Sequence, residues 1–368
     1  MANTRVFFAT NREPIPHDGE PVTGFDKELN RKSPLWLRYG VAGMEPGKKG
    51  QAYRLADLFV APENIPNTDG AESDVVLLGS DAVYEGLRKQ LVAQKGKADV
   101  VLMLHGYGCD FENAMSNAAQ IKDQLSTTAK PLEVAMFSWP SDGTVVPFIS
   151  YVSDRDDARS SAKAVARALM RFLAYLAELE RKVRAGLMKP EELCRANIHL
   201  IAHSMGNYAL RNALQALISE FGSRTLPRVF KTIFLMAADE DNDAFEHATK
   251  LARLPELAEE VCVYFARNDG ALVISDVSKG NPDRLGATGP RTLTSLPQKV
   301  TLIDCTDVSE TGATLKERTL DSRHQYYRKR PEVMEDMRQV IAGKPPEAVP
   351  NREWIPARTC FRIKAARR

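Results

Sequence analysis

Six short apolar segments limit what this chain can fold into. Each is apolar at nearly every position instead of every second one, so both faces of the resulting strands are expected to be buried. They are DVVLMLH (99–105), LEVAMFSW (132–139), NIHLIAH (197–203), KTIFLMAA (231–238), EVCVYFA (260–266) and KVTLIDC (299–305). Amphipathic stretches predict helices at 111–126, 154–184, 206–221, 243–257 and 331–343. The alternation predicts an α/β fold, a mostly parallel sheet with helices on both faces.

The rest of the chain extends this core at both ends. Residues 1–95 hold the strand-like pieces RVFFAT, LRYGVA and VVLLG between turns rich in Pro and Gly, and are predicted to lead into the sheet. Residues 96–343 form the core, and residues 344–368 form a Pro-rich, basic tail. The last part of this tail, RTCFRIKAARR, has five basic residues and no acidic one, which predicts a solvated segment. One structural domain is expected overall.

Composition excludes several classes of protein. The chain has 50 basic and 48 acidic residues, a net charge of +2, so no overall field attracts nucleic acid or a membrane surface. Its longest apolar runs are shorter than the roughly 20 residues that span a bilayer. The N-terminus has no long apolar stretch of the secretion-signal type, and five scattered cysteines do not suggest a disulfide framework. These features predict a cytoplasmic location.

A serine interrupts the third apolar segment, in NIHLIAHSMGNYALRNALQAL. Ala202, Ser204 and Gly206 fit the small-x-Ser-x-Gly pattern, with an apolar strand before it and an amphipathic helix after it. A sharp turn between strand and helix needs small neighbours, and it exposes the serine at its apex as a nucleophile. The simpler interpretation is a strand, a turn and a helix with a chance serine. The strand and helix around it favour the nucleophile.

A nucleophilic serine needs a base and a carboxylate, which follow it in the order Ser, Asp or Glu, His in this type of fold. Only His247 and His324 follow Ser204, and His247 lies in a predicted helix, so His324 is the predicted base. Asp269 directly follows the strand EVCVYFA and is the preferred acid. The acidic cluster AADEDND, with Asp239 and Asp241, is the alternative.

Attack on a carbonyl also needs N–H donors for the developing oxyanion. The backbone N–H of Met205, directly after the serine, is one predicted donor, and Tyr107 in HGYGCDFENA is the other. Trp139, in FSWPSDG, is expected either to pack in the core or to line an acyl-binding pocket. Residues 279–298, rich in Gly and Pro, are expected to form part of the entrance, as a lid or as a plain surface loop.

No cofactor or metal is predicted. His199 and His203 lie four apart on a strand, about 13 Å, which is too far for one ion. The segment GMEPGKKG lacks the spacing and the Ser or Thr of a phosphate loop, and HGYG lacks the third glycine of a dinucleotide fingerprint. The predicted partner is therefore a small-molecule ester or acyl substrate, and the sequence does not indicate an oligomeric state.

With these residues identified, the chain resembles the bacterial α/β-hydrolases of the family named alpha/beta hydrolase of unknown function, DUF900. The similarity rests on FFATNRE, LHGYGCDFENA, FSWPSDG, AHSMGN, AADEDNDAF, YFARNDGALVIS and His324, in this order over roughly residues 5–328. It implies the α/β-hydrolase fold and a triad of Ser204, Asp269 and His324. The expected activity is cleavage of carboxylic esters through an acyl-enzyme. An acyltransferase or amidase with the same triad, or a non-catalytic binding module, are the alternatives.

Overall fold

The structure is a computed structural model of the 368-residue chain. It describes residues 3–48, 52–62, 64–65, 77–141, 149–222, 224–272, 283–294, 296–309 and 323–365.

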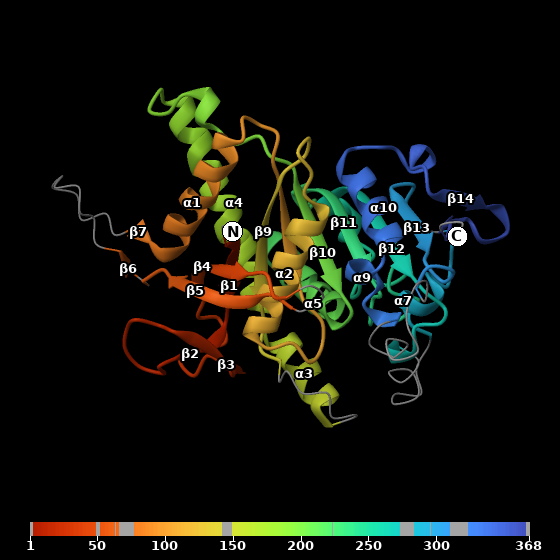
Figure 1. The fold of residues 1–368 in the computed structure, drawn as a ribbon, viewed down its shortest axis with the longest axis horizontal. Helices are drawn as coiled ribbons and strands as arrows, with labels where there is room; N and C mark the ends of the chain where they lie inside the picture. The colour runs from red at the N-terminus through yellow and green to blue at the C-terminus, as the bar shows by residue number, and fades with distance from the viewer. Residues whose placement is uncertain are drawn as a thin grey trace.

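Among these residues, eleven strands form one large sheet (Figure 1). From one edge to the other they are β14 (Arg352–Ile355), β15 (Cys360–Ile363), β13 (Val300–Asp304), β12 (Ala258–Phe265), β11 (Phe230–Met236), β10 (Ile198–His203), β8 (Asp99–Leu104), β9 (Leu132–Ser138), β1 (Thr4–Thr10), β4 (Arg38–Glu45) and β5 (Arg54–Val60). The pairs from β15 through β1 are parallel, and β14, β4 and β5 add antiparallel edges. All six strands predicted for the core are present.

Both faces of the central strands are buried, which explains their continuous apolar sequences. In β10, Ile201 packs into one hydrophobic cluster, together with helices α2 (Phe111–Leu125) and α10 (Pro331–Ile341). Its neighbours Leu200 and Ala202 pack into another cluster on the opposite face, beneath α5 (Met205–Phe221). Because successive side chains of a strand point to opposite faces, each strand must be apolar at both sets of positions.

The helices form layers on both sides of the sheet (Figure 1). The remaining helices are α1 (Gly79–Ala93), α3 (Ile149–Ser160), α4 (Ala162–Arg184), α7 (Leu285–Thr288) and α9 (Tyr326–Lys329), with 3₁₀ turns η1 (Pro190–Glu192), η2 (Leu254–Leu257), η3 (Pro346–Ala348) and η4 (Pro356–Arg358). No helix in the described ranges is long and apolar enough to cross a membrane. This arrangement of sheet and helices is that of the α/β-hydrolase fold.

The two ends of the chain are more ordered than their sequences indicate. The predicted N-terminal strands lie in β1 and β4, and VVLLG ends in β7 (Leu77–Leu78), which pairs with β6 (Asn64–Ile65); its residues 75 and 76 lie outside the described part. The short strands β2 (Arg12–Ile15) and β3 (Gly24–Leu29) form a separate pair. The prediction of a solvated segment at 358–368 is wrong for β15, because Cys360 and Ile363 are buried where β15 pairs with β13.

Two predicted helices also differ from the structure. The stretch 154–184 forms two helices, α3 and α4, with Ser161 between them, and its hydroxyl accepts a hydrogen bond from Asn11 at 3.0 Å. The stretch 243–257 is not an α-helix: it consists of turns and ends in η2. Lys250 in this stretch forms ion pairs with Asp243 and with Asp241, and Asp241 also pairs with distant Arg284; this tertiary network replaces the helical pattern.

The strand order brings the predicted site residues to one edge of the sheet. The chain runs from β8 to β9 on one side and then returns to β10 on the other side of β8. The carboxyl ends of β8 and β10 therefore flank a point where the strand order reverses, the usual position of binding sites in open α/β sheets. The loops after β11, β12 and β13 begin at the same edge.

Candidate functional site at the carboxyl edge of the sheet

Ser204 occupies the turn between β10 and α5. Its backbone has φ 53° and ψ −123°, a conformation that residues other than glycine rarely adopt. The Ser204 N–H donates to the Met236 carbonyl at 3.0 Å, and its own carbonyl accepts from Asn207 and Asp239. These contacts hold the strained turn in place, as expected of a nucleophile presented on a strand-to-helix turn.

Two glycines allow this turn to pack against the neighbouring strand. A Cβ atom on Gly206 would lie 2.5 Å from the Leu104 carbonyl oxygen at the end of β8. A Cβ atom on Gly106 would lie 2.9 Å from the Ser204 Cβ atom. The absence of a side chain at both positions therefore brings the loop after β8 into direct contact with the serine turn.

The predicted base and acid lie together. His324 Nδ1 is 2.8 Å from Asp269 Oδ2, although 55 residues separate them in the sequence. Asp269 follows β12 and is fully buried, and His324 is 8% exposed. A carboxylate at this distance accepts the Nδ1–H hydrogen bond and leaves Nε2 as the basic nitrogen of the neutral ring.

His203, next to the serine, holds the segment that carries His324. Its Nε2 lies 3.2 Å from the His324 carbonyl oxygen, to which it donates, and its ring stacks on Tyr327 with centroids 4.4 Å apart. Burial and then the nearby His324 lower the pKa of His203 well below its usual value, so the ring is neutral. His203 thus connects the turn that carries Ser204 to the segment that carries His324.

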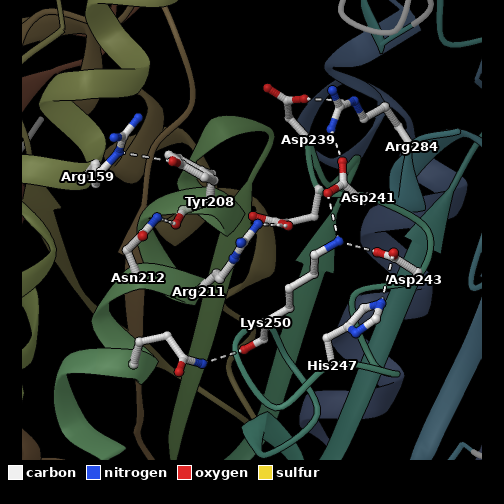
Figure 2. A network of polar contacts seen from close by, with 12 residues as sticks. Arg159, Tyr208, Arg211, Asn212, Asp239, Asp241, Asp243, His247, Lys250 and Arg284 are labelled. Atoms are coloured by element: carbon white, nitrogen blue, oxygen red, sulfur yellow. Dashed lines mark hydrogen bonds and ion pairs between the residues drawn. The ribbon is translucent and has the colours of Figure 1, made fainter. Parts of the chain in front are cut away.

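The alternative acids lie at the same edge with other partners (Figure 2). Asp239 follows β11, accepts a hydrogen bond from Tyr151 Oη at 2.5 Å, and lies 3.5 Å from Arg284 Nε. Asp241 receives Arg284 Nη1 at 2.6 Å and Lys250 Nζ at 2.9 Å. Both carboxylates are thus engaged by cations of this loop network, whereas Asp269 contacts His324.

The predicted oxyanion donors belong to two segments that meet at the serine turn, α5 and the loop after β8. Met205 is the first residue of α5, where backbone N–H groups have no partner within the helix. Tyr107 lies in the loop after β8, with its ring edge against Tyr151 of α3 at 5.8 Å between centroids. The next N–H group in this loop, Gly108, donates to Asp154 Oδ2 of α3 at 3.1 Å. Helix α3 therefore braces the loop that carries Tyr107.

A buried arginine supports the same loop, and sequence reasoning missed it. Arg12, within the motif FFATNRE, donates from Nη2 to the Cys109 carbonyl at 2.7 Å and from Nε to Ser138 Oγ at 2.9 Å. Burial lowers the pKa of Arg12 to about 10, so the guanidinium remains charged at neutral pH. The polar run Asn-Arg-Glu directly after the apolar strand RVFFAT was the available sequence signal. Arg12 ties the N-terminal extension to the loop after β8.

Trp139 is fully buried, which favours the core-packing interpretation of this residue. Its ring stacks on His105, with centroids 4.7 Å and planes 9° apart, and its Nε1 donates to the His105 carbonyl at 3.0 Å. Burial, with a smaller effect of Arg12, lowers the pKa of His105 to about 3. The neutral imidazole and the indole together form a rigid floor beneath the loop after β8.

Part of the predicted entrance segment also packs in the core. Residues 279–282 and 295 lie outside the described part of the chain. Among the others, Arg284 and Leu285 are fully buried, and a Cβ atom on Gly286 would lie 2.2 Å from the Ala238 nitrogen. This region therefore joins the loop after β11 to the core.

All five cysteines are free, and the described residues contain no cluster of three or more His, Cys, Asp or Glu side chains arranged to hold a metal ion.

Comparison with known proteins agrees with this fold. The chain is 24% identical over 238 residues to the uncharacterized protein alr1448 of Nostoc sp., and the match covers 58% of this chain and 51% of that protein. It thus spans about half the length of this curated relative. A family model described as alpha/beta hydrolase of unknown function matches residues 80–343, more than half of the sequence. The chain therefore belongs to the alpha/beta hydrolase family of unknown function, DUF900.

Proposed function

We propose that the protein is a serine hydrolase that cleaves carboxylic esters. Ser204 Oγ attacks the ester carbonyl carbon while His324 Nε2 takes its proton, and Asp269 orients and stabilises the protonated ring. The backbone N–H groups of Tyr107 and Met205 bind the oxyanion. The C–O bond to the alcohol then breaks, and His324 returns the proton to the leaving oxygen. Water hydrolyses the acyl-enzyme in the same way, and the acid is released.

The observation that carries this proposal is the hydrogen bond between His324 and Asp269, at the edge where Ser204 has its strained backbone. A hydrogen-bonded, buried carboxylate fixes the tautomer that a general base requires. His203 supports the proposal as well, because it is a neutral donor to the His324 carbonyl and adds no competing charge beside the base. Membership of an α/β-hydrolase family points to the same class of reaction.

Labelling with a fluorophosphonate probe tests the nucleophile. We expect the full-length protein to be labelled, and Ser204→Ala to remove the label while the melting temperature stays close to that of the wild type. Ser160→Ala, an exposed serine at the end of α3, is the matched control and should label normally. Labelling that persists in Ser204→Ala would overturn the assignment.

Substrate class is tested with p-nitrophenyl esters of graded chain length, for the wild type beside Ser204→Ala. Added alcohols and amines in the same assay separate hydrolysis from acyl transfer, because a transferase gives the new ester or amide as its main product. An anilide substrate tests amidase activity.

The cytoplasmic location predicted from the sequence belongs to the same proposal, and fractionation of cells that express the protein tests it.

A further inference from the structure

A buried carboxylate of helix α3 holds the loop after β8. Asp154 is fully buried, although Ser153 and Asp156 beside it on the helix are exposed. Its Oδ2 accepts a hydrogen bond from the Gly108 N–H at 3.1 Å and another from the Ser141 hydroxyl. A charge is costly to bury unless it is hydrogen-bonded and compensated, and Asp154 obtains these hydrogen bonds from the loop and from Ser141.

Ser141 extends this contact to the next residue of the loop. Its hydroxyl oxygen accepts from the Cys109 N–H at 3.1 Å while the hydroxyl donates to Asp154. The backbone of Gly108 has φ 63°, a left-handed conformation of the kind that turns successive N–H groups toward one side. One carboxylate thus holds the two amides that follow Tyr107, the first directly and the second through Ser141.

Arg12 holds the same region through carbonyl groups. Its Nη2 donates to the Cys109 carbonyl at 2.7 Å, and its Nη1 donates to the Ser141 carbonyl at 3.3 Å. Burial lowers the pKa of Arg12 most, and nearby negative charges, Asp154 among them, raise it, so the guanidinium and this carboxylate lie within electrostatic range. Two buried charges of opposite sign therefore compensate each other across the loop.

These contacts fix the peptide planes around Tyr107. The Gly108 N–H belongs to the same planar peptide as the Tyr107 carbonyl, so its hydrogen bond to Asp154 sets the plane after Tyr107. The plane before Tyr107 contains the Gly106 carbonyl, which lies 2.9 Å from His105 Nδ1. The Tyr107 N–H lies in this second plane. Its direction is therefore set by contacts on both sides of the residue.

We propose that Asp154 is a positioning residue for ester hydrolysis: its carboxylate sets the loop after β8 so that the Tyr107 N–H faces the oxyanion that forms on attack by Ser204. This inference rests on the proposed function, because the oxyanion arises only if Ser204 attacks a carbonyl. Asp154 itself does not touch the substrate. It acts through the loop, and a donor displaced by about 1 Å loses much of its effect on the transition state.

Kinetics with a p-nitrophenyl ester test this role. Asp154→Ala should lower kcat about 10²-fold and change KM less than about threefold, because the oxyanion is present in the transition state and not in the bound ester. Asp154→Asn keeps an oxygen that accepts from Gly108 and Ser141, so it should recover most of the loss. Asp156→Ala, at an exposed position of the same helix, is the matched control and should keep the wild-type kcat.

A thionoester separates oxyanion binding from a general loss of structure. Sulfur replaces its carbonyl oxygen and is a weak hydrogen-bond acceptor, so the wild type should favour the matching ester strongly. Asp154→Ala should lower the ratio of kcat/KM for ester over thionoester at least about tenfold. A variant that is only partly folded loses both rates equally. Asp269→Asn, which affects the base, should keep the wild-type ratio.

Amide hydrogen exchange of residues 105–111 reads the loop without a substrate. Exchange should be at least about tenfold faster in Asp154→Ala than in Asp156→Ala, because the Gly108 amide has lost its acceptor. Ser141→Ala removes only the contact to Cys109 and should show a smaller increase in exchange and a smaller loss of kcat. This milder variant keeps the test valid if Asp154→Ala does not fold.

Several results would overturn the proposal. An unchanged kcat, an unchanged ester-to-thionoester ratio or an unchanged exchange rate in Asp154→Ala each excludes a positioning role. A higher KM with the wild-type kcat would assign Asp154 to substrate binding instead. Failure of the proposed function is distinct, because the wild type would then show neither ester hydrolysis nor fluorophosphonate labelling, and the inference would fall with it.

Discussion

The loops after β11 and β12 carry acidic residues at the same edge of the sheet, but their partners differ. Asp239 and Asp241, after β11, face Arg284 and Lys250 in a dense ion-pair network (Figure 2). Asp269, after β12, is hydrogen-bonded to His324. A carboxylate shared among cations stabilises a loop, whereas one that faces an imidazole orients the base in the mechanism we propose. The position at the sheet edge is common to both loops, and the partner decides the role.

The largest expected effect separates the two loops by activity. Asp269→Asn should lower kcat/KM for ester hydrolysis by about 10³- to 10⁴-fold, because the amide no longer fixes the His324 tautomer or stabilises its charge. Asp239→Asn is the matched control and should lower kcat/KM less than about tenfold. Assays of both variants on one p-nitrophenyl ester give the answer. Equal losses would mean that the two carboxylates share the catalytic role.

The second effect concerns stability. Arg284→Met leaves Asp239 and Asp241 without their buried cation, so the free energy of unfolding should fall by about 3–5 kcal/mol. Urea denaturation of the purified variant measures this loss. Arg291→Met, which breaks an exposed pair with Glu246, is the control and should change stability little. If both variants unfold at the same urea concentration, the β11 network is not what holds this loop.

The third effect is a pH dependence within the β11 loop. Burial raises the pKa of Glu240 to about 7, partly offset by Arg211. Between pH 4.5 and 7 the folded protein therefore holds a proton that the unfolded chain has released. This group makes stability fall with rising pH, by about 1.4 kcal/mol per unit.

Glu240→Gln should remove that contribution, so its stability relative to the wild type increases from pH 5 to pH 7. Urea denaturation at both values measures the difference, and exposed Glu259→Gln serves as the control. A constant difference between Glu240→Gln and the wild type across this range would show that Glu240 ionises at the same pH in both states.

The smallest effect concerns the rim of the network. His247 is about half exposed and contacts Asp243 at 3.1 Å. His247→Ala should therefore change the free energy of unfolding by less than about 0.5 kcal/mol and leave ester hydrolysis unchanged. Loss of hydrolysis in this variant would make His247 a rival to His324 as the base. The same denaturation and ester assays decide between them.

Local patterns were enough for much of the fold. Continuous apolar runs located all six core strands, and helical spacing located α2, α5 and α10, because burial on both faces or on one stripe leaves a direct trace in the sequence. The pattern failed at 243–257, where Lys250 pairs with Asp243 and Asp241, and Asp241 pairs in turn with Arg284. It also missed α1 and β15, whose burial depends on distant parts of the chain.

The sequence by itself determined the order of the candidate catalytic residues along the chain: a serine between small residues, then acids after two later strands, then His324. Only the tertiary structure decided which acid meets the histidine, that His203 donates to the His324 carbonyl, and that Arg12 supports the loop after β8. The physical reason is range. A turn or an amphipathic helix is encoded by neighbours, whereas a hydrogen bond across 55 or more residues exists only once the sheet has brought its strand ends together.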